Sequence, residues 1–429
     1  MKPIRILLLG SGGREHALAW KLSSSRHCEK LFIAPGNAGT ATCGENVDIS
    51  INDFLAIQSF CLREHISMVI VGPEEPLVNG IYDYFQSDAA LRNIALIGPS
   101  KEAARLEGSK AFAKAFMLRH DIPTASYREF DTDNYEEGVD YLQAHSIPIV
   151  LKADGLAGGK GVIICNNHVE AMAEFELMLQ HSKFGEAGEK VVVEEFLQGI
   201  ELSVFVLTDG TDYVLLPEAK DYKRIGEGDH GLNTGGMGAV SPVPFADAAF
   251  MEKVRQRIIE PTVKGLQKEK LEYKGFIFFG LISVDDEPFV IEYNCRMGDP
   301  ETEVVIPRLN SDLVEIFMAV SQQRVSEIKI DIDQRAAATV MAVSAGYPGP
   351  YEKGFEIEGL EILNEDDVLI FHSGTKILDE KLVTDGGRVL TVTAYGENIV
   401  KAVHRSNKIM EFIYFTGMYH RKDIGYEFS

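Results

Sequence analysis

The chain has 429 residues, of which 45% are hydrophobic and 25% charged, and this balance excludes wholesale disorder and collagen-like repeats. Its 65 acidic residues outnumber 42 lysines and arginines, so the formal net charge is −23. Such a chain is a poor match for nucleic acid or for an anionic membrane surface, because both attract basic faces. Any anion site must therefore be built locally, from motifs. The length itself predicts about three domains.

The five cysteines are scattered, odd in number and without a C-x-x-C pair. This pattern is typical of reduced thiols and argues against disulfides and against a structural zinc site. No apolar run reaches the ~20 residues of a membrane helix, and no signal peptide precedes the first predicted strand. We therefore expect a cytoplasmic protein without a membrane partner.

In residues 1–103, short apolar runs that end in Gly or Pro alternate with helix-like stretches. This alternation predicts a first α/β domain, a Rossmann-like parallel sheet covered by helices on both faces. Ligands of such sheets bind at the carboxyl ends of the strands. The predicted strands lie at 4–10, 31–37, 67–74 and 95–100, with helices at 15–22 and from residue 53.

Beyond residue 103 the pattern changes twice, which predicts a second domain over 104–327 and a β-rich third domain over 328–429. The dipeptides Gln198-Gly199 and Asp209-Gly210 are typical of antiparallel turns, and residues 225–241 indicate an ordered glycine-rich loop. Predicted strands lie at 147–155, 161–167, 190–197, 201–210, 213–221, 275–285, 288–296, 336–346, 367–377 and 388–396, and predicted helices at 109–119, 168–181, 247–269, from 312, and 398–413.

The first motif, GSGGREH at 10–16, is similar to the dinucleotide fingerprint G-x-G-x-x-G, but Glu15 holds the third glycine position. The second strand also ends at residues 35–37 without the acid that would bind a ribose hydroxyl, which disfavours a nicotinamide cofactor. The amides of Gly12 and Gly13 at a helix start, with Arg14, favour an anion site. A plain tight turn is the alternative.

The second motif, KADGLAGGKGV at 152–162, fails as a Walker A loop because Asp154 and Gly161 stand where Gly and Ser or Thr are needed. A glycine flap between two antiparallel strands can still close over a triphosphate, its amides donating to the phosphate oxygens. An ordinary hairpin tip is the alternative. The candidate phosphate contacts are Lys152, Gly155, Gly158, Gly159, Lys160 and Gly161.

Two further motifs are weaker. In KVVVEEFLQGIE, the strand that ends in Glu194-Glu195, followed by Phe196-Leu197, offers backbone edges to an adenine ring, although a solvated edge strand explains it equally well. Asp221, Lys223 and Arg224 precede a permissive glycine loop at 235–238. Such mixed charges are typical of a site that orients a zwitterion or positions phosphates.

The last motif is PFVIEYNCRMGDPET at 288–302. Glu292 and Asn294 are two residues apart on a predicted strand, so both side chains point to one face. Two oxygen ligands on one face suit Mg²⁺, which binds hard oxygens and retains waters and substrate phosphates. Arg296 shares this face if the strand continues, and its guanidinium would neutralise phosphoryl or carboxylate oxygens. The alternative is a solvated polar strand face.

Taken together and in this order, the motifs resemble those of the ATP-grasp ligases, and within them the phosphoribosylamine–glycine ligase family. The chain departs from the family's usual pattern at Tyr222 in place of His, Leu232 in place of Pro, and Glu303 in place of Gln. The resemblance extends over nearly the whole chain, through the strings GGREHALAW, APGNAGT, VGPEEPLV, LEGSKAF, KADGLAGGKGV, NTGGMGA, NCRMGDPET, GGRVL and RKDIG.

The resemblance implies an ATP-grasp fold over 104–327, with a mobile lid subdomain at about 122–195. It implies ligation of glycine to 5-phosphoribosylamine through glycyl phosphate, with ATP and Mg²⁺ or Mn²⁺ as cofactors and no side-chain nucleophile. It assigns catalysis to Arg296 and Lys152 and the metal to Glu292 and Asn294. The resemblance further implies that ATP is bound by Lys152, the flap and Lys110, Glu194, Glu195, Phe196, Leu197 and Glu201. It implies that the substrates are bound by Gly12, Gly13, Arg14, Glu15, Pro35, Gly36, Asn37, Thr40, Asp221, Lys223, Arg224 and Arg296.

Three rival interpretations remain. Another ATP-grasp carboxylate–amine ligase would cleave ATP with a different acceptor, whereas a nucleotide-binding module without turnover would lack Glu292, Asn294 or Arg296. An oxidoreductase is disfavoured by Glu15. We expect small-molecule substrates only, no nucleic acid, and a monomer.

Overall fold

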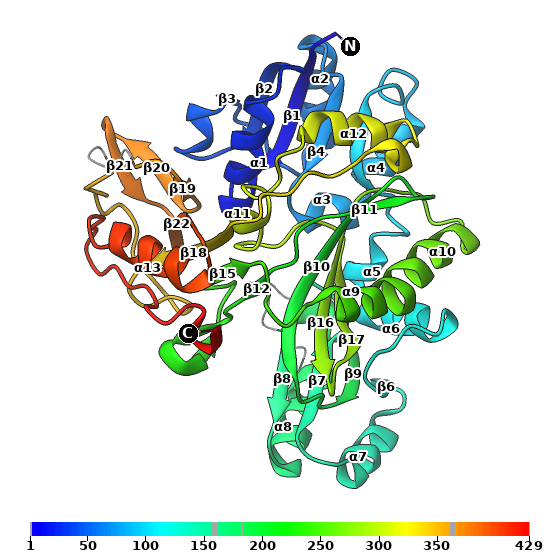
Figure 1. The fold of residues 1–429 in the computed structure, drawn as a ribbon. Helices are drawn as coiled ribbons and strands as arrows, with labels where there is room; N and C mark the ends of the chain where they lie inside the picture. The colour runs from blue at the N-terminus through cyan, green and yellow to red at the C-terminus, as the bar shows by residue number, and fades with distance from the viewer. Residues whose placement is uncertain (1, 157–160, 182, 361–364, 429) are drawn as a thin grey trace.

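The computed structural model describes residues 2–156, 161–181, 183–360 and 365–428 (Figure 1). The largest sheet runs in the order β11-β10-β16-β5-β4-β1-β2-β3, with β17 paired to β16. Strands β1 to β5 pair in parallel, as predicted, and β16 then joins β5 in antiparallel fashion. The bounds are β1 (Ile4–Gly10), β2 (Cys28–Pro35), β3 (Glu45–Asn46), β4 (Met68–Val71), β5 (Ala95–Pro99), β10 (Ile200–Thr208), β11 (Tyr213–Leu215), β16 (Tyr273–Val284) and β17 (Glu287–Asn294).

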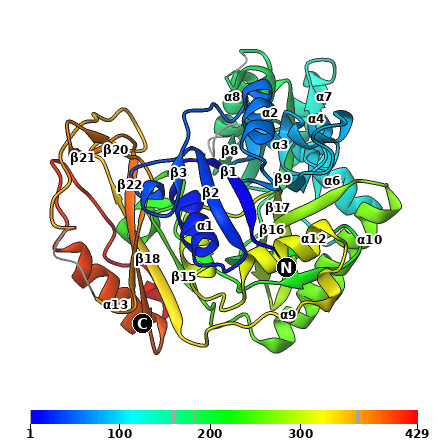
Figure 2. The same ribbon diagram turned by 90° about the horizontal axis from the view of Figure 1, so that it is seen from above.

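The parallel part of this sheet is covered on both faces, which explains its nearly continuous apolar strands. In β1, Leu7 and Leu9 face one core cluster, and Ile6 and Leu8 face the other. Helix α1 (Gly13–Ser23) lies over one face, as Figure 2 shows. The opposite face is covered by α2 (Phe54–Arg63), α3 (Glu74–Val78) and α4 (Ile81–Ser87).

A separate four-stranded antiparallel sheet, in the order β6-β9-β7-β8, extends from the body of the molecule (Figure 1). Two helices pack on one face of this sheet. Phe130, Leu151 and Phe175 are buried in the core between the helices and the strands. The elements are β6 (Tyr127–Asp131), β7 (Ile149–Ala153), β8 (Val162–Cys165), β9 (Lys190–Glu195), α7 (Tyr135–Ala144) and α8 (His168–Leu179).

The predicted hairpin at Gln198-Gly199 is wrong. Strand β9 pairs with β6 and β7, whereas β10 pairs with β11 and β16, so the dipeptide carries the chain from one sheet to another. Gly199 passes so close to the backbone of Ser283 that a Cβ would overlap its carbonyl oxygen. The glycine therefore allows the chain to pass close to β16 as it enters the large sheet. The turn predicted at Asp209-Gly210 is confirmed, between β10 and β11.

The third sheet has the order β12-β15-β18-β22-β19, and α13 (Ile399–Met410) packs on it. The run predicted as one strand at 213–221 is divided between β11 and β12, which belong to different sheets. Residues 225–241, expected as a loop, hold the hairpin β13–β14 and strand β15. The bounds are β12 (Lys220–Asp221), β13 (Arg224–Gly226), β14 (His230–Asn233), β15 (Gly238–Ser241), β18 (Ala336–Val343), β19 (Val368–His372) and β22 (Arg388–Gly396).

The remaining elements connect these sheets. The strand predicted at 367–377 ends at His372 and is followed by the small hairpin β20–β21. Among the described residues no helix is both long and apolar enough to cross a membrane. The connecting elements are α5 (Arg105–Gly108), α6 (Lys110–Arg119), α9 (Ala248–Val254), a π-helical turn (Arg255–Ile259), α10 (Glu260–Lys268), α11 (Thr302–Val305), α12 (Leu313–Ser321), β20 (Thr375–Leu378) and β21 (Lys381–Thr384).

Strand β19 of the third sheet is held against the N-terminal sheet by side-chain hydrogen bonds. Asn37 donates from Nδ2 to the carbonyl oxygens of Ser11 and His372, both at 2.8 Å. The backbone N–H of His372 donates to His16 Nδ1, also at 2.8 Å. Burial, with a contribution from nearby His372, lowers the pKa of His16 to about 3. The contact therefore requires a neutral His16.

Replacing His16 with Gln should make the protein less sensitive to acid. Because the folded-state pKa of His16 is depressed, its stabilising contribution is complete above the unfolded value of 6.5 and is lost as the pH falls towards 3. Each pH unit in this window costs wild type about 1.4 kcal/mol more than the variant. Thermal unfolding at several pH values measures the difference. The exposed His404, changed to Gln, is the control, and equal acid sensitivity of wild type and His16→Gln would contradict the assignment.

Candidate active site

A cluster of charged side chains, called the candidate cleft below, lies on the side of the four-stranded sheet that is turned away from α7 and α8. Along β7, Ile149 and Leu151 point into the helix-covered core, so alternation places Lys152 on the opposite face. On β9, Val191 and Val193 are in the same core, which turns Glu194 towards Lys152. Both charged side chains are buried, at 4% and 3% exposed. Burial of such groups requires that they be paired.

Glu194 pairs with two lysines. Lys152 Nζ lies 2.9 Å from Glu194 Oε2 and also donates to the carbonyl oxygen of Ile291 at 3.0 Å. Lys114 Nζ, on α6, lies 3.1 Å from Glu194 Oε1 and donates to Thr124 Oγ1 at 2.7 Å. Burial lowers the pKa of Lys114 to about 8, although Glu194 opposes the shift. Lys114 was not among the predicted site residues, and its position one turn after Lys110 is the only sequence signal for it.

The base of the glycine flap is tied to the start of α6. Ser109 caps this helix, and its hydroxyl donates to Asp154 Oδ1 at 3.0 Å. Lys110 Nζ donates to the carbonyl oxygen of Gly155 at 3.1 Å. Burial lowers the pKa of Lys110, with Glu292 opposing the shift. At the other end of the flap, the carbonyl oxygen of Gly161 accepts from the backbone N–H of Ala153. The flap residues Gly158, Gly159 and Lys160 lie outside the described residues.

Strand β17 brings Glu292 and Asn294 to the cleft, and Asn294 is 8% exposed. A bulge in β17 at this point leaves the carbonyl oxygen of Ile291 free for Lys152. Burial opposes ionisation of Glu292, but Lys223, Lys152 and Lys110 together hold its pKa below the usual value. The result is an ionised carboxylate beside an amide oxygen, a donor pair that fits a hard divalent cation.

Lys223 links this carboxylate to two others. Its Nζ lies 3.2 Å from Glu201 Oε2 and 3.9 Å from Asp221 Oδ1, and these carboxylates, with Glu292, hold the pKa of Lys223 well above its usual value. Burial raises the pKa of Asp221, which Lys223 opposes. Arg224, by contrast, donates to the carbonyl oxygen of Gly231 within the β13–β14 hairpin.

Arg296 lies past the end of β17, because the strand stops at Asn294 rather than continuing as predicted. Its NH2 lies 2.8 Å from Glu107 Oε1, and its Nε lies 3.2 Å from Glu74 Oε2. Burial raises the pKa of Glu107 to about 7, although Arg296 opposes the shift. Neither Glu74 nor Glu107 was predicted, although both lie in the quoted strings VGPEEPLV and LEGSKAF.

The residues that the resemblance assigns to adenine continue after Glu194. Glu195 accepts from the backbone N–H of Ser126 at 2.8 Å, so its side chain is used in joining β6 to β9. Phe196 is 40% exposed, and Leu197 is half-buried.

The start of α1 lies beside the segment after β17. Arg14 donates from NH1 to the carbonyl oxygen of Met297 at 3.2 Å and from its backbone N–H to Asp299 Oδ2, also at 3.2 Å. The Glu15 carboxylate pairs with Arg14 Nε at 2.6 Å and accepts from the N–H of Gly12 at 2.7 Å. Glu15 therefore shapes the turn rather than facing the cleft.

The second predicted loop is also internally bonded. Asn37 Oδ1 accepts from the N–H groups of Gly39 and Thr40, and the Thr40 hydroxyl donates to the carbonyl oxygen of Asn37. Pro35 is exposed and Gly36 is half-buried at the tip.

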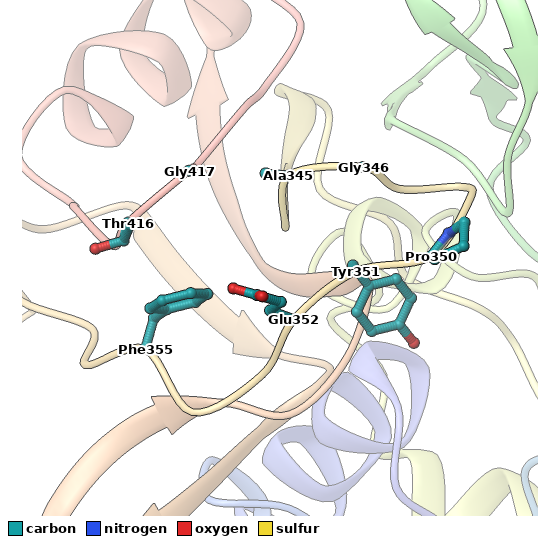
Figure 3. A pocket seen from close by; sticks show the side chains of 8 residues that line it. All are labelled: Ala345, Gly346, Pro350, Tyr351, Glu352, Phe355, Thr416 and Gly417. Carbon is teal, nitrogen blue, oxygen red and sulfur yellow. The ribbon is translucent and has the colours of Figure 1, made fainter.

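A second hollow, outside this cleft, lies in the third domain (Figure 3). Its eight described lining residues carry one acid, Glu352, and no lysine or arginine, so it does not suit a polyphosphate. It is formed by residues 345–355 and 416–417, among them Tyr351, Phe355 and Thr416.

Three family models match the chain. The phosphoribosylglycinamide synthetase N domain matches residues 4–107, its ATP-grasp (A) domain residues 108–302, and its C domain residues 337–427. The chain belongs to the phosphoribosylglycinamide synthetase family. It is therefore a ligase with an ATP-grasp fold, of the type that serves purine biosynthesis.

Named relatives agree with this family. The chain is 46% identical to the phosphoribosylamine–glycine ligase of Pasteurella multocida, over 99% of this chain and 98% of that one. It is also 46% identical to the trifunctional purine biosynthetic protein adenosine-3 of Gallus gallus, over 98% of this chain, but it spans only 42% of that protein.

Solved structures support the fold. The phosphoribosylamine–glycine ligase of Thermotoga maritima superposes with a TM-score of 0.84 at 34% identity, covering 98% of this chain and 100% of that chain. The biotin carboxylase domain of 2-oxoglutarate carboxylase from Hydrogenobacter thermophilus, solved with MgADP and bicarbonate, has a TM-score of 0.73 at 15% identity, with coverage of 98% and 92%. The second likeness shows the ATP-grasp fold alone.

The three departures from the family pattern lie in different surroundings. Tyr222 is 1% exposed and donates from its hydroxyl to Glu427 Oε2 at 2.9 Å, away from the cleft lysines. Leu232 is 65% exposed on β14. Glu303 is fully buried near α1.

Replacing Lys114 with Met should weaken ATP binding, because Glu194 would lose one of its two cations. We expect the KM for ATP to rise by roughly tenfold, since charge-assisted hydrogen bonds contribute ~1.5–3 kcal/mol. In wild type the KM for ATP should also rise as Lys114 loses its proton above its pKa of about 8, and this step should vanish in the variant. Initial rates at varied ATP and pH measure both effects, with the exposed Lys401→Met as control. A wild-type pH profile in Lys114→Met would refute the role.

Proposed function

We propose that this chain joins glycine to 5-phosphoribosylamine with cleavage of ATP, giving glycinamide ribonucleotide, ADP and phosphate. The observation that carries the proposal is the cluster of three lysines, Lys110, Lys152 and Lys223, whose charges act on the carboxylate of Glu292 beside Asn294. This cluster lies in a chain that matches named ligases over almost their entire length. The substrates are small molecules, and the proposed place of action is the cytoplasm.

Activation of the carboxyl group is the first step that such a site must serve. The glycine carboxylate attacks the γ-phosphorus of ATP, which yields glycyl phosphate and ADP. The nitrogen of phosphoribosylamine then attacks the glycyl carbonyl carbon, phosphate leaves, and the nitrogen loses a proton. A free carboxylate is a poor acyl donor, and phosphorylation supplies the leaving group. Phosphoryl transfer needs chiefly positioning and charge neutralisation.

The residues of the chain supply both. Lys110 and Lys152 would neutralise the α- and β-phosphates, and Arg296 the transferred phosphoryl group or the glycine carboxylate. These groups are held in place by Gly155, Glu194 and the Glu74–Glu107 pair before any ligand arrives. Such preorganisation lowers the barrier because little has to move during the reaction.

Glu292 and Asn294 fit a divalent metal, Mg²⁺ or Mn²⁺, because together they offer an ionised carboxylate and an amide oxygen in a lysine-rich cleft. When bound, the metal would supply charge neutralisation to the phosphate oxygens.

The nucleotide's other parts have candidate contacts around the lysines. Glu194, Phe196 and Leu197 would meet the adenine ring, with Glu195 behind them, and Glu201 would accept from the ribose hydroxyls. The flap that begins at Gly155 and ends at Gly161 would close over the phosphates. Closure would also keep water from hydrolysing the acyl phosphate.

The amine substrate is assigned to the edge of the N-terminal sheet. The N-terminus of α1, at Gly12, Gly13 and Arg14, would hold its phosphate, and the loop from Pro35 to Thr40 would border its ribose. Asp221 and Lys223 would orient the glycine zwitterion.

The alternative, another ATP-grasp carboxylate–amine ligase, shares the lysines and the metal ligands but uses another acceptor. A phosphate-release assay with glycine alone, with phosphoribosylamine alone and with both separates the two. The proposal expects sustained release only with both substrates. Release driven by a different amine, without glycinamide ribonucleotide, would favour the alternative.

Glu292→Ala or Lys152→Ala should abolish this phosphate release while leaving the protein folded. The first removes an ionised metal ligand, and the second removes a cation from the phosphates. The matched controls are Glu397→Ala and Lys401→Ala, a pair on the exposed face near α13. Circular dichroism verifies folding. Near-normal turnover in either cleft variant would refute the assignment.

Metal dependence offers a separate measurement. Chelation should abolish activity, and Mg²⁺ or Mn²⁺ should restore it. Glu292→Gln should raise the metal concentration for half-maximal rate on the order of tenfold or more, because a charged ligand contributes ~1.5–3 kcal/mol. A metal titration unchanged in this variant would place the ion elsewhere.

A further inference from the structure

Beneath the start of α1 lies a group of buried polar atoms without hydrogen-bond partners among the described residues. Glu303, on α11, is 0% exposed, and neither of its carboxyl oxygens has a partner. The hydroxyl oxygens of Ser373 and Thr391 are also buried and also lack hydrogen-bond partners among the described residues. Unpartnered buried polar atoms are rare in native proteins, and each needs an explanation.

The Glu303 carboxyl group lies directly against the helix start. A Cβ on Gly13, the first residue of α1, would overlap Glu303 Oε1 and would lie 2.7 Å from Ser373 Oγ. A side chain at position 13 would have to displace the Glu303 carboxyl group, which therefore lies against the first peptides of α1, at the positive end of the helix dipole. The backbone of Glu303 is itself fixed, because the Thr393 hydroxyl donates to its carbonyl oxygen at 3.0 Å.

The charges around Glu303 do not balance an ionised carboxylate. Arg388 on β22 is committed to Asp299, with NH1 3.0 Å from Oδ1 and 2.6 Å from the carbonyl oxygen. Arg14 on α1 is committed to Glu15 at 2.6 Å. The other carboxyl group nearby, Glu301, adds further negative charge. Burial and Asp299 accordingly raise the pKa of Glu303 well above its usual value, although Arg388 opposes the shift.

We propose that Glu303 is held as a neutral carboxylic acid against the start of α1, which leaves the positive end of that helix free for the phosphate of the amine substrate. A protonated carboxyl group carries no charge and, like a carboxamide, has both a hydrogen-bond donor and an acceptor. This inference rests on the proposed function, which assigns the substrate phosphate to Gly12, Gly13 and Arg14.

The neutral state has a consequence for anion binding. With Glu303 uncharged, the positive end of α1 remains available to a phosphate. An ionised Glu303 would place a negative charge against Gly13 and repel that phosphate at close range. The ATP cleft, built around Lys152 and Glu194, has no contact with Glu303 and should not respond.

Infrared difference spectroscopy tests the protonation directly. The spectrum of wild type minus that of E303Q, recorded near neutral pH on the full chain, should contain the carbonyl stretch of a protonated carboxylic acid. The exposed Glu397, changed to Gln, should give only carboxylate bands. Absence of the protonated-acid band in the Glu303 difference spectrum would overturn the proposal.

Equilibrium binding of ribose 5-phosphate, a stable probe that carries the substrate's sugar and phosphate, tests the effect of the neutral state on anion binding. E303Q and E303L are uncharged at every pH, so both should bind this probe with wild-type affinity if the wild-type carboxyl group is already neutral. Binding of ATP should be the same in all three proteins. Probe binding about tenfold tighter in E303Q than in wild type would show an ionised Glu303 and would overturn the proposal.

Neither measurement requires turnover, so a failure of this inference can be distinguished from a failure of the proposed function. Should E303L not fold, as thermal unfolding would show, E303Q and the infrared spectrum still decide the protonation. If glycine and phosphoribosylamine together do not drive phosphate release but the protonated-acid band is present, the proposed substrates are wrong and the neutral state of Glu303 stands.

Discussion

The cleft depends on one constraint, which is that an ammonium or guanidinium group cannot be buried without an opposite charge. Lys114 and Lys152 share Glu194, and Arg296 lies between two glutamates. Lys223, whose side chain is 47% exposed, also lies beside Asp221 and Glu201. An acidic protein can thus hold several cations close together, because its carboxylates keep each of them in position.

Three parts of the fold hold the chain around the end of β17. Lys152 of the four-stranded sheet donates to the carbonyl oxygen of Ile291, and Arg14 of α1 donates to that of Met297. From the third sheet, Arg388 donates to the carbonyl oxygen of Asp299. Each of these bonds ends on or just beyond β17, so the segment that carries Glu292 and Asn294 is fixed from three directions.

Local patterns in the sequence predicted local features well. The apolar run of β1 and the capping residues Asp53 and Ser109 mark their elements within about two residues, because burial and capping act over short stretches. The partners Lys114 and Glu107 were missed because their contacts join segments far apart in the chain, and no spacing encodes such a meeting. The prediction at Gly199 failed for a related reason: in the sequence, a glycine that lets the chain pass close to a neighbouring strand resembles a glycine in a tight turn.

Environment, rather than residue type, decides what a buried glutamate does in this fold. Glu194 and Glu303 are both buried and both follow apolar or small residues in a motif string. Glu194 has two lysines within 3.1 Å and serves as their counter-charge. Glu303 lies against Gly13, near the Ser373 hydroxyl and other acids, and the neighbouring Arg388 is already paired with Asp299. An uncharged amide could therefore replace Glu303. At position 194, an amide would leave two buried lysines without a counter-charge.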